Sequence, residues 1–337
     1  MTANDVHQMA AAVAAAAERL REHVLATPLL PSPWLSQELN ADVRLKLENV
    51  QLGGSFKIRG ATNALLCLDE DRRRRGVVAA SSGNHGLCLA LAGKRLAVPT
   101  KVYVPKTTPP AKRAAIEALG AAVTVHGDDC VETERHARAT AAERGWSYVS
   151  PYNDADVIAG QGTVMREIAT AWPQVDSVYI ALGGGGLMAG MASWAQAHAP
   201  AAAMVGCSPA QSPAFAECLR QGQIVEVACG DTWSDSTAGG VEEGAITLDL
   251  CRGLVHTLVD VEEDAIAAAM RDALAHQHLL LEGAAGVAIA ACRQHVARVD
   301  ADGEGAGKES SPRPRRIAIV ACGGNLPYEL LQRLIAT

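Results

Sequence analysis

One lysine stands in a setting that could make it a nucleophile. Lys57 lies in the heptapeptide SFKIRGA at 55–61, which directly follows Gly53 and Gly54. Burial disfavours the ammonium form, so a lysine among apolar neighbours could form a Schiff base with an aldehyde. The alternative is a surface lysine at a helix start, with its stem packed and its charge in water. The heptapeptide leaves both interpretations open. An aldehyde cofactor would also need a phosphate site and groups beside its ring.

A run of four glycines is the best candidate for the phosphate site. Gly183 to Gly186, followed by Leu187, lie between a predicted strand at 176–182 and a predicted helix at 188–198. Free N–H groups and the helix dipole favour an anion at such a turn. A tight turn without a ligand is the alternative, although consecutive glycines cost conformational entropy. No carboxylate follows the next predicted strand to bind a ribose, and the Walker lysine is missing, so a single phosphate fits better than a dinucleotide.

A second polar turn, SSGNHG at 81–86, runs from a predicted strand into a predicted helix. Its hydroxyls, amide and N–H groups could cap the helix, or they could bind a carboxylate and a phenolic oxygen. Other catalytic patterns are weaker. Residues 206–210 lack the closing glycine of a nucleophile elbow, and Cys322 has no evident histidine partner. Glu282 could simply begin a helix, where a carboxylate is favourable.

Strands and helices alternate along most of the chain, which predicts right-handed βαβ units and mainly parallel sheets. The segment with Pro28, Pro31 and Pro33 is expected to be irregular, and the charged insertion at 300–315 is expected to be mobile. The predicted strands lie at 43–47, 76–80, 100–104, 121–125, 147–149, 176–182, 203–207, 254–261 and 317–320. The predicted helices include an N-terminal one ending before Thr27 and others at 59–69, 87–93, 110–119, 131–144, 160–172, 188–198, 211–219, 247–251, 262–276 and 282–298.

Composition excludes several classes of protein. The 337 residues suggest about two domains. A net charge of -7 argues against nucleic-acid binding, and no apolar run is long enough to span a membrane. Nine cysteines, an odd number without a C-x-x-C pair, indicate free thiols in a reducing, cytoplasmic compartment. No H-E-x-x-H occurs, so we expect no metal. Arg72 to Arg75 are interpreted as a solvated helix end rather than an anion-binding patch.

Taken together, four motifs resemble the pyridoxal-phosphate enzymes of fold type II, and most closely the threonine/serine dehydratases and serine racemase. They are SFKIRGA at 55–61, SSGNHG at 81–86, the turn Gly183–Leu187, and CGGN at 322–325. The resemblance implies an α/β fold of two open, mainly parallel twisted sheets flanked by helices, like the β subunit of tryptophan synthase. It implies a large cofactor-binding domain from 1–50 and 151–337, a small substrate-closing domain from 51–150, and a homodimer.

The resemblance also implies roles. Lys57 would hold pyridoxal phosphate as a Schiff base, Asn84 would bind its phenolic oxygen, and Cys322 would face its pyridine nitrogen. The implied catalytic residues are Lys57 and Ser82. The implied cofactor-binding residues are Phe56, Lys57, Asn84, Gly183, Gly184, Gly185, Gly186, Leu187, Gly240, Glu282 and Cys322. The implied substrate-binding residues are Ser81, Ser82, Gly83, Asn84 and His85.

The implied reaction is β-elimination from a β-hydroxy amino acid to a 2-oxo acid and ammonia. Racemisation is the alternative within the same chemistry, with Ser82 as the second acid; a non-catalytic binding protein and a nicotinamide oxidoreductase are alternatives from other classes. Some relatives bind a divalent ion at positions that match Ser208 and Ala214, which cannot serve here. The segment Asp235–Gly244 resembles the dehydratase-like proteins of hydroxyectoine breakdown. The chain ends soon after CGGN, where biosynthetic threonine dehydratases continue into a regulatory domain.

Overall fold

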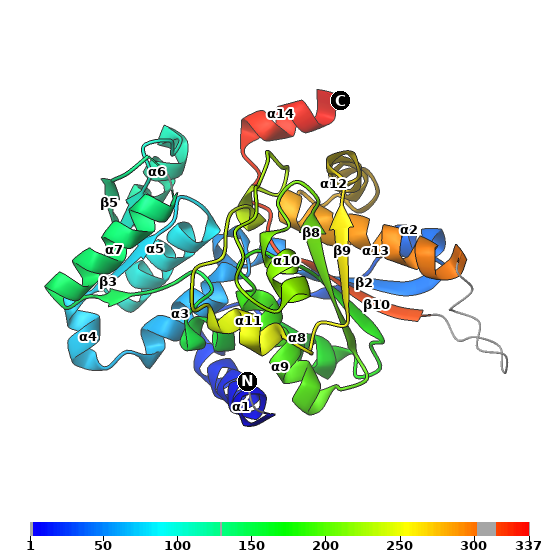
Figure 1. Ribbon diagram of the computed structural model, residues 1–337, viewed down its shortest axis with the longest axis horizontal. Coiled ribbons are helices and arrows are strands. Elements are labelled where there is room, and N and C mark those ends of the chain that lie inside the picture. The colour runs from blue at the N-terminus through cyan, green and yellow to red at the C-terminus, as the bar shows by residue number, and fades with distance from the viewer. Residues whose placement is uncertain (1–2, 129, 302–314, 337) are drawn as a thin grey trace.

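A computed structural model describes residues 3–128, 130–301 and 315–336 as two separate sheets with helices around them (Figure 1). The larger sheet has six strands in the order β1-β2-β10-β7-β8-β9, and all pairs except β1 with β2 are parallel. These strands are β1 (Leu29–Pro31), β2 (Ala41–Leu47), β7 (Ser177–Ala181), β8 (Ala203–Pro209), β9 (Thr257–Val261) and β10 (Arg315–Ala321).

The smaller sheet has four parallel strands in the order β5-β4-β3-β6. They are β3 (Val77–Ala80), β4 (Thr100–Val104), β5 (Ala122–Val125) and β6 (Ser147–Tyr148). The predicted fold class, α/β with two open and mainly parallel sheets, is thus confirmed. The small sheet uses residues 77–148 and the large one uses residues on both sides of that range. The division into domains at 50 and 151 stays a prediction.

The described helices cover the faces of both sheets. They are α1 (Ala3–Leu20), α2 (Pro33–Glu38), α3 (Lys57–Cys67), α4 (Glu70–Arg75), α5 (Asn84–Leu96), α6 (Pro110–Ala118), α7 (Cys130–Arg144), α8 (Ala155–Ala171), α9 (Gly186–His198), α10 (Ala214–Gln221), α11 (Ile246–Cys251), α12 (Glu263–Gln277), α13 (Gly283–Ala301) and α14 (Tyr328–Ala336). Short 3₁₀ turns lie at Glu48–Val50, Leu52–Gly54 and Asp235–Thr237.

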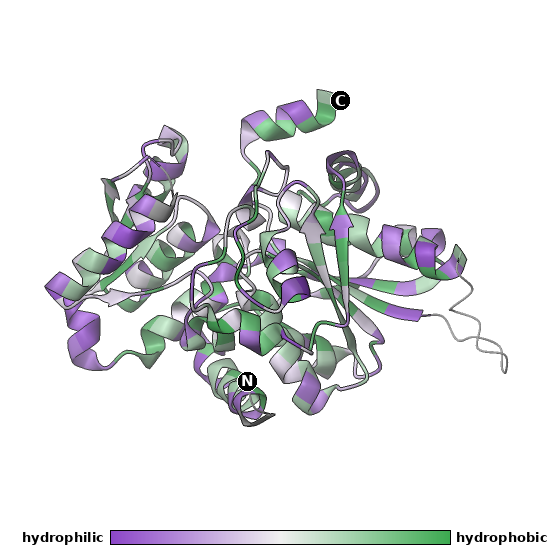
Figure 2. Cartoon of the chain, in the orientation of Figure 1, coloured by the Kyte–Doolittle hydropathy of each residue, from purple (hydrophilic) through white to green (hydrophobic). Residues whose placement is uncertain are grey.

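The main core lies on the large sheet. The strands read as nearly continuous apolar runs, such as Ile317 to Ala321, because helices bury both faces of a parallel sheet. The hydropathy colouring shows the same division, with apolar residues along the strands and polar ones on the outer helices (Figure 2). Helix α3, which begins at Lys57, packs against α8. This contact connects the segment after the lysine loop to the helices around the large sheet.

Local sequence signals explain most differences from the predicted elements. The segment at Pro28–Pro33 is not irregular: β1 pairs with β2, and α2 begins at Pro33 after Ser32, whose hydroxyl accepts a bond from the N–H of Leu35 at 3.4 Å. Helix α8 begins five residues earlier than predicted because Asp154 caps it. Helix α10 begins at Ala214, not at 211, and α14 was not predicted.

Several expectations about the surface can be compared with the structure. The arginines at 72–75 form the exposed end of α4, where Arg74 pairs with Glu70 and Asp71, so the solvated helix end is confirmed. Among the cysteines whose side chains are described, all are free thiols. No helix within the described ranges is long and apolar enough to cross a membrane. Most of the insertion predicted at 300–315 lies outside the described residues.

Candidate active site

Three of the motifs lie at one edge of the large sheet. Strands β2, β10 and β7 are neighbours, and the carboxyl ends of parallel strands meet at the same edge. The lysine loop follows β2, the turn at 322–325 follows β10, and the glycine turn at 183–186 follows β7. The polar turn at 81–83 follows β3 of the small sheet and leads into α5. Ligands of open α/β sheets bind at such edges, where the strand order reverses.

Lys57 is the first residue of α3 and is partly buried. Its Nζ donates a hydrogen bond to the backbone carbonyl of Pro151 at 2.8 Å and lies 5.1 Å from the centre of the Phe56 ring. Burial lowers the pKa of Lys57 to about 8, although Cys88, Cys322 and Glu282 oppose the shift. A larger share of this amine than of an ordinary lysine is therefore unprotonated near neutral pH, and the unprotonated form is the one that acts as a nucleophile or base.

Backbone hydrogen bonds hold the lysine loop against the turn at 322–325. The N–H of Phe56 donates to the carbonyl of Cys322 at 3.1 Å, and the N–H of Gly324 donates to the carbonyl of Gly54 at 2.9 Å. The same turn accepts a bond from the N–H of Glu282 to the carbonyl of Gly323 at 3.1 Å. A Cβ at Gly323 would lie 2.6 Å from a carboxylate oxygen of Glu282, so a side chain there would displace that carboxylate.

Glu282 lies at the start of α13 and is buried, with 7% of its surface exposed. Its carboxylate accepts hydrogen bonds from the Asn84 amide at 2.9 and 3.0 Å and from the Ser236 hydroxyl at 3.0 Å. Burial raises the pKa of Glu282 against these bonds. The Oδ1 of Asn84 accepts a bond from the Asn325 amide at 2.8 Å. Residues from α5, the 235–237 turn, α13 and the turn after β10 therefore form one polar cluster.

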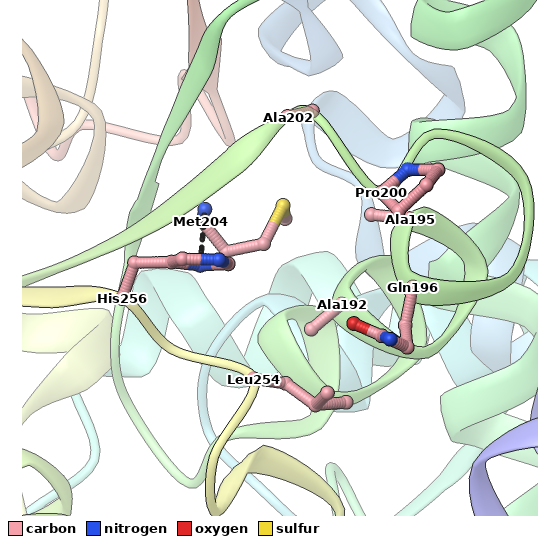
Figure 3. A pocket seen from close by; sticks show the side chains of 8 residues that line it. All are labelled: Ala192, Ala195, Gln196, Pro200, Ala202, Met204, Leu254 and His256. Carbon is pink, nitrogen blue, oxygen red and sulfur yellow. Dashed lines mark hydrogen bonds between the residues drawn. The ribbon is translucent and has the colours of Figure 1, made fainter.

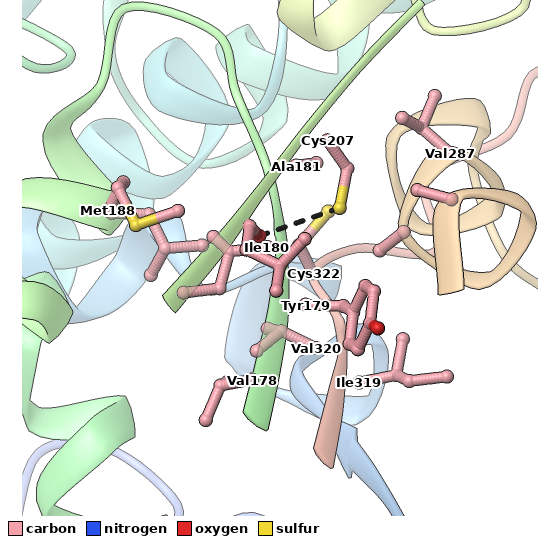
Figure 4. Close-up of a cluster of buried hydrophobic side chains, with 14 of the residues drawn as sticks. Val178, Tyr179, Ile180, Ala181, Met188, Cys207, Val287, Ile319, Val320 and Cys322 are labelled. Atoms are coloured by element: carbon pink, nitrogen blue, oxygen red, sulfur yellow. Dashed lines mark hydrogen bonds between the residues drawn. The ribbon is translucent and has the colours of Figure 1, made fainter. Parts of the chain in front are cut away.

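Cys322 is buried at the end of β10 within the large hydrophobic cluster (Figure 4). Burial raises the pKa of its thiol well above the ordinary value, and the nearby Glu282 charge adds to the rise. The thiol is therefore neutral at physiological pH. Its surroundings are compatible both with contact to a ring and with the plain packing role that buried free cysteines often have.

The glycine turn at 183–186 forms a cradle of backbone without side chains, and two aromatic rings lie directly against it. A Cβ at Gly184 would lie 2.3 Å from the Tyr152 ring, and one at Gly185 would lie 2.2 Å from Phe215. Gly185 also has a φ of 84°, a conformation that glycine adopts without strain. No side chain caps the first turn of α9, which begins at Gly186. Uncapped N–H groups beside side-chain-free backbone fit the needs of a phosphate.

The turn at 81–86 is similarly open at its start. Gly83 precedes α5 without a side-chain cap, and the Ser81 hydroxyl accepts a weak bond from the N–H of Gly83 at 3.3 Å. His85 points elsewhere, since its Nε2 bonds to the carbonyl of Val149 at 2.9 Å. Burial and the Lys57 charge lower the pKa of His85 to about 3. The imidazole is therefore neutral and supplies no positive charge for a carboxylate.

Gly240 is exposed, and an added Cβ there would meet no atom within 4 Å. Its assignment as a residue that faces the cofactor ring stays a prediction. The side chains of Ser236, Asn325 and Tyr152 do belong to the site region but were not assigned roles from sequence. The position of Asn325 in the CGGN turn could have drawn attention to it, whereas nothing in the sequence singled out Tyr152.

Two cavities elsewhere in the molecule are distinct from this site. A cavity of about 10 Å³, room for about one water, lies at the C-terminal end of α9, the opposite end from the glycine turn; His256 lines it and accepts a bond from the N–H of Met204 at 3.0 Å (Figure 3). A larger cavity of about 450 Å³ lies between α1 and α8 above Lys46 and Arg59. Neither cavity is lined by Lys57 or the glycine turn.

Within the described residues, no group of three or more potential ligands could hold a metal ion. Ser208 and Ala214 are both buried, and neither carries a carboxylate. We expect EDTA to leave activity and the thermal unfolding midpoint nearly unchanged, because a hard divalent ion prefers carboxylate oxygens. Activity assays and thermal melts with and without EDTA check this. A large loss that magnesium or calcium restores would contradict it.

The fold and this site define a class of protein. It is an α/β protein in which a lysine amine of lowered pKa and a glycine-rich turn lie at the carboxyl ends of the strands of one parallel sheet. A family model described as "Pyridoxal-phosphate dependent enzyme" matches residues 20–323. An L-threonine ammonia-lyase of Thermotoga maritima is 34% identical over 316 residues, which cover 94% of this chain and 75% of that protein. The L-threo-3-hydroxyaspartate ammonia-lyase of Saccharomyces cerevisiae is 31% identical over 321 residues, covering 95% and 94%.

The solved structure of processed threonine deaminase isoform 2 from Solanum lycopersicum superposes with a TM-score of 0.91 at 30% identity, covering 100% of this chain and 94% of that one. This chain belongs to the pyridoxal-phosphate-dependent enzymes and has their type II fold. Its cofactor is pyridoxal phosphate. The residues fit that group, since the amine of Lys57 suits an aldehyde and the uncapped glycine cradle suits a phosphate.

Proposed function

We propose that this enzyme catalyses β-elimination from a β-hydroxy amino acid and releases a 2-oxo acid and ammonia. The observation that carries the proposal is the partly buried amine of Lys57, with a pKa of about 8, near a neutral thiol at Cys322. The similar proteins from Thermotoga maritima and Saccharomyces cerevisiae, both named ammonia-lyases, support the same reaction class.

Pyridoxal phosphate, when bound, supplies the carbonyl group that takes up an amine and the conjugated ring that accepts negative charge from Cα. In our proposal the amine of Lys57 would hold the cofactor and would also take the Cα proton of the substrate as a general base. Its lowered pKa supports this role, because a pKa close to working pH increases the share of amine that can accept a proton.

The remaining roles follow from the positions of the side chains. The backbone N–H groups of Gly183–Leu187 would hold the phosphate, and Phe56 would pack beside the ring. Asn84 would hydrogen-bond the phenolic oxygen, with Glu282 behind it, and Gly240 would face the ring. The segment from Ser81 to His85, which leads into α5, would bind the substrate carboxylate. It would do so through N–H groups and hydroxyls, since His85 itself is neutral.

The substrate experiment is a panel of L- and D-hydroxyamino acids, including threonine, serine, hydroxyaspartate and hydroxy-diaminobutyrate derivatives, assayed for 2-oxo acid and ammonia. We expect both products in equal amounts from at least one L-hydroxyamino acid. Conversion of an L-amino acid into its D-form without ammonia would instead identify a racemase, with Ser82 as the second acid. The hydroxyectoine-derived substrate and the homodimer belong to this proposal on the basis of resemblance, and the cytoplasmic location belongs to it on the basis of the free cysteines.

Cys322 should influence which reaction follows proton removal. An aspartate opposite the ring nitrogen keeps that nitrogen protonated, whereas a neutral thiol is only a weak donor. We therefore expect Cys322→Ser to keep most of the elimination activity. Cys322→Asp should lower elimination and raise the share of turnovers that leave the cofactor in its amine form. Product assays and the visible absorbance of the cofactor measure both quantities.

An unchanged rate and an unchanged cofactor spectrum in Cys322→Asp would show that this residue does not face the ring nitrogen. Cys322 would then have only the packing role that its buried position also allows.

A further inference from the structure

Three amide and carboxylate side chains form a continuous line from the lysine loop to Glu282. The Asn325 Nδ2 donates to the backbone carbonyl of Gly53 at 2.8 Å and to the Oδ1 of Asn84 at 2.8 Å. The Asn84 Nδ2 then donates to both carboxylate oxygens of Glu282, at 3.0 and 2.9 Å. Asn84 and Glu282 are buried, whereas Asn325 is exposed.

The chemistry of these groups gives the line a direction. A backbone carbonyl oxygen only accepts, so the atom of Asn325 that faces Gly53 must be the amide nitrogen. That nitrogen carries the second N–H, which faces Asn84, so Asn84 must present its oxygen there. The nitrogen of Asn84 is then turned toward Glu282. An amide has nearly the same shape after a half-turn, so its orientation is decided by such partners alone.

The starting carbonyl is itself held in place. Gly53 has a φ of 72°, which places its peptide groups in an orientation that other residues rarely adopt. A Cβ at this position would also lie 3.0 Å from the Sγ of Cys88. The conformation of the loop before Lys57 thus determines where the Gly53 carbonyl points.

We propose that Asn325 is a positioning residue that sets the orientation of the Asn84 amide. The Asn84 nitrogen then faces Glu282, where one N–H serves both carboxylate oxygens and the other is left for the cofactor. The inference rests on the proposed role of Asn84 in binding the cofactor. If the Asn84 amide turned round, its oxygen would face the Glu282 carboxylate, and two acceptors would lie together without a proton between them.

Asn325→Asp and Asn325→Ala separate orientation from packing. The aspartate keeps the shape of the side chain but has only acceptors, so it should attract the N–H groups of Asn84 and turn its amide. The alanine loses the shape but adds no acceptor, and water can replace the lost donor at this exposed position. The matched control is Asn40→Asp, which makes the same change at an exposed position just before β2, at the opposite end of that strand from the lysine loop.

The readout is the dissociation constant of pyridoxal phosphate, titrated into each apo-protein and followed by absorbance, with thermal melts to check folding. We expect Asn325→Asp to raise this constant about 10–100-fold, the size of an unmade bond to a buried charged group. Asn325→Ala should raise it less, and Asn40→Asp should stay within about twofold.

The proposal is tested by which of the two variants, Asn325→Asp or Asn325→Ala, binds pyridoxal phosphate more tightly. If Asn325→Asp binds the cofactor as well as the unaltered protein, or better than Asn325→Ala, then Asn325 only fills space and the proposal fails. Should Asn325→Asp not fold, Asn325→Ser replaces it. Serine keeps one donor and should bind the cofactor more tightly than alanine; the reverse order would also reject the proposal. Because the readout is cofactor affinity, it stands even if the proposed elimination reaction is wrong.

Discussion

Lys57→Ala should lower the rate of 2-oxo acid formation by about 10³-fold or more, since the variant loses both the attachment point of the cofactor and the proposed base. The amine of Lys57 is the only group that these proposals assign to both tasks. Its pKa is lowered, and its Nζ donates a hydrogen bond to the backbone carbonyl of Pro151. The amine is therefore available to react. Rates measured with saturating pyridoxal phosphate check the prediction, because the phosphate cradle should still bind the cofactor.

Borohydride provides a second measure of the same residue. The unaltered protein should be yellow, and reduction should attach a pyridoxyl group permanently to Lys57, which peptide mass spectrometry can locate. Lys106→Ala is a suitable control, because Lys106 is exposed and forms a surface ion pair with Asp128. A label on another lysine, or an active Lys57→Ala variant, would show that the assignment is wrong.

Arg59→Met should lower the free energy of unfolding by about 3–5 kcal/mol, the cost of leaving a buried charge without its partner. Arg59 is fully buried two residues after Lys57. Its guanidinium donates to both oxygens of Glu48 at 2.8 Å and to Glu167 at 2.6 and 2.9 Å. Lys46 also pairs with Glu167. The variant removes the guanidinium that pairs with the carboxylate of Glu48, and this carboxylate has no exposed surface.

The loss should depend on pH in a defined direction. Burial alone would raise the pKa of Glu48, but the charge and hydrogen bonds of Arg59 hold it below its ordinary value. A carboxylate with a lowered folded-state pKa adds stability above its unfolded-state pKa, and that stability is lost as the pH falls through the folded-state pKa. The difference between Arg59→Met and the unaltered protein should therefore be largest near neutral pH and shrink below about pH 5.

Urea unfolding at several pH values, with pyridoxal phosphate saturating in every sample, measures this difference. Arg74→Met is the matched control, because Arg74 pairs with Glu70 and Asp71 on an exposed helix and such pairs contribute about 0–1 kcal/mol. Equal losses in the two variants would contradict a special role for the buried network.

The chemistry of the site could largely be predicted from short stretches of the chain. Lys57, the four glycines, the polar turn at 81–86 and the CGGN turn each follow a predicted strand, and these strands are confirmed as parallel. Parallel strands direct the turns after β2, β7 and β10 to one edge of the large sheet, whereas the turn at 81–86 follows a strand of the small sheet. Sequence placed all four motifs in one site through their resemblance to a known family. Glycine and proline act through their own backbone preferences, which is why the turns could be recognised locally.

The partners of the buried polar groups were decided only by the tertiary structure. Asn84 meets Glu282 across 198 residues and Asn325 across 241, and no local pattern encodes such a distance. Sequence placed Arg59 at the start of a predicted helix and did not identify its partners, Glu48 and Glu167, the second of which is 108 residues away. A buried charge is stable only with its partners, and those partners come from whichever elements the packing of the sheets brings together.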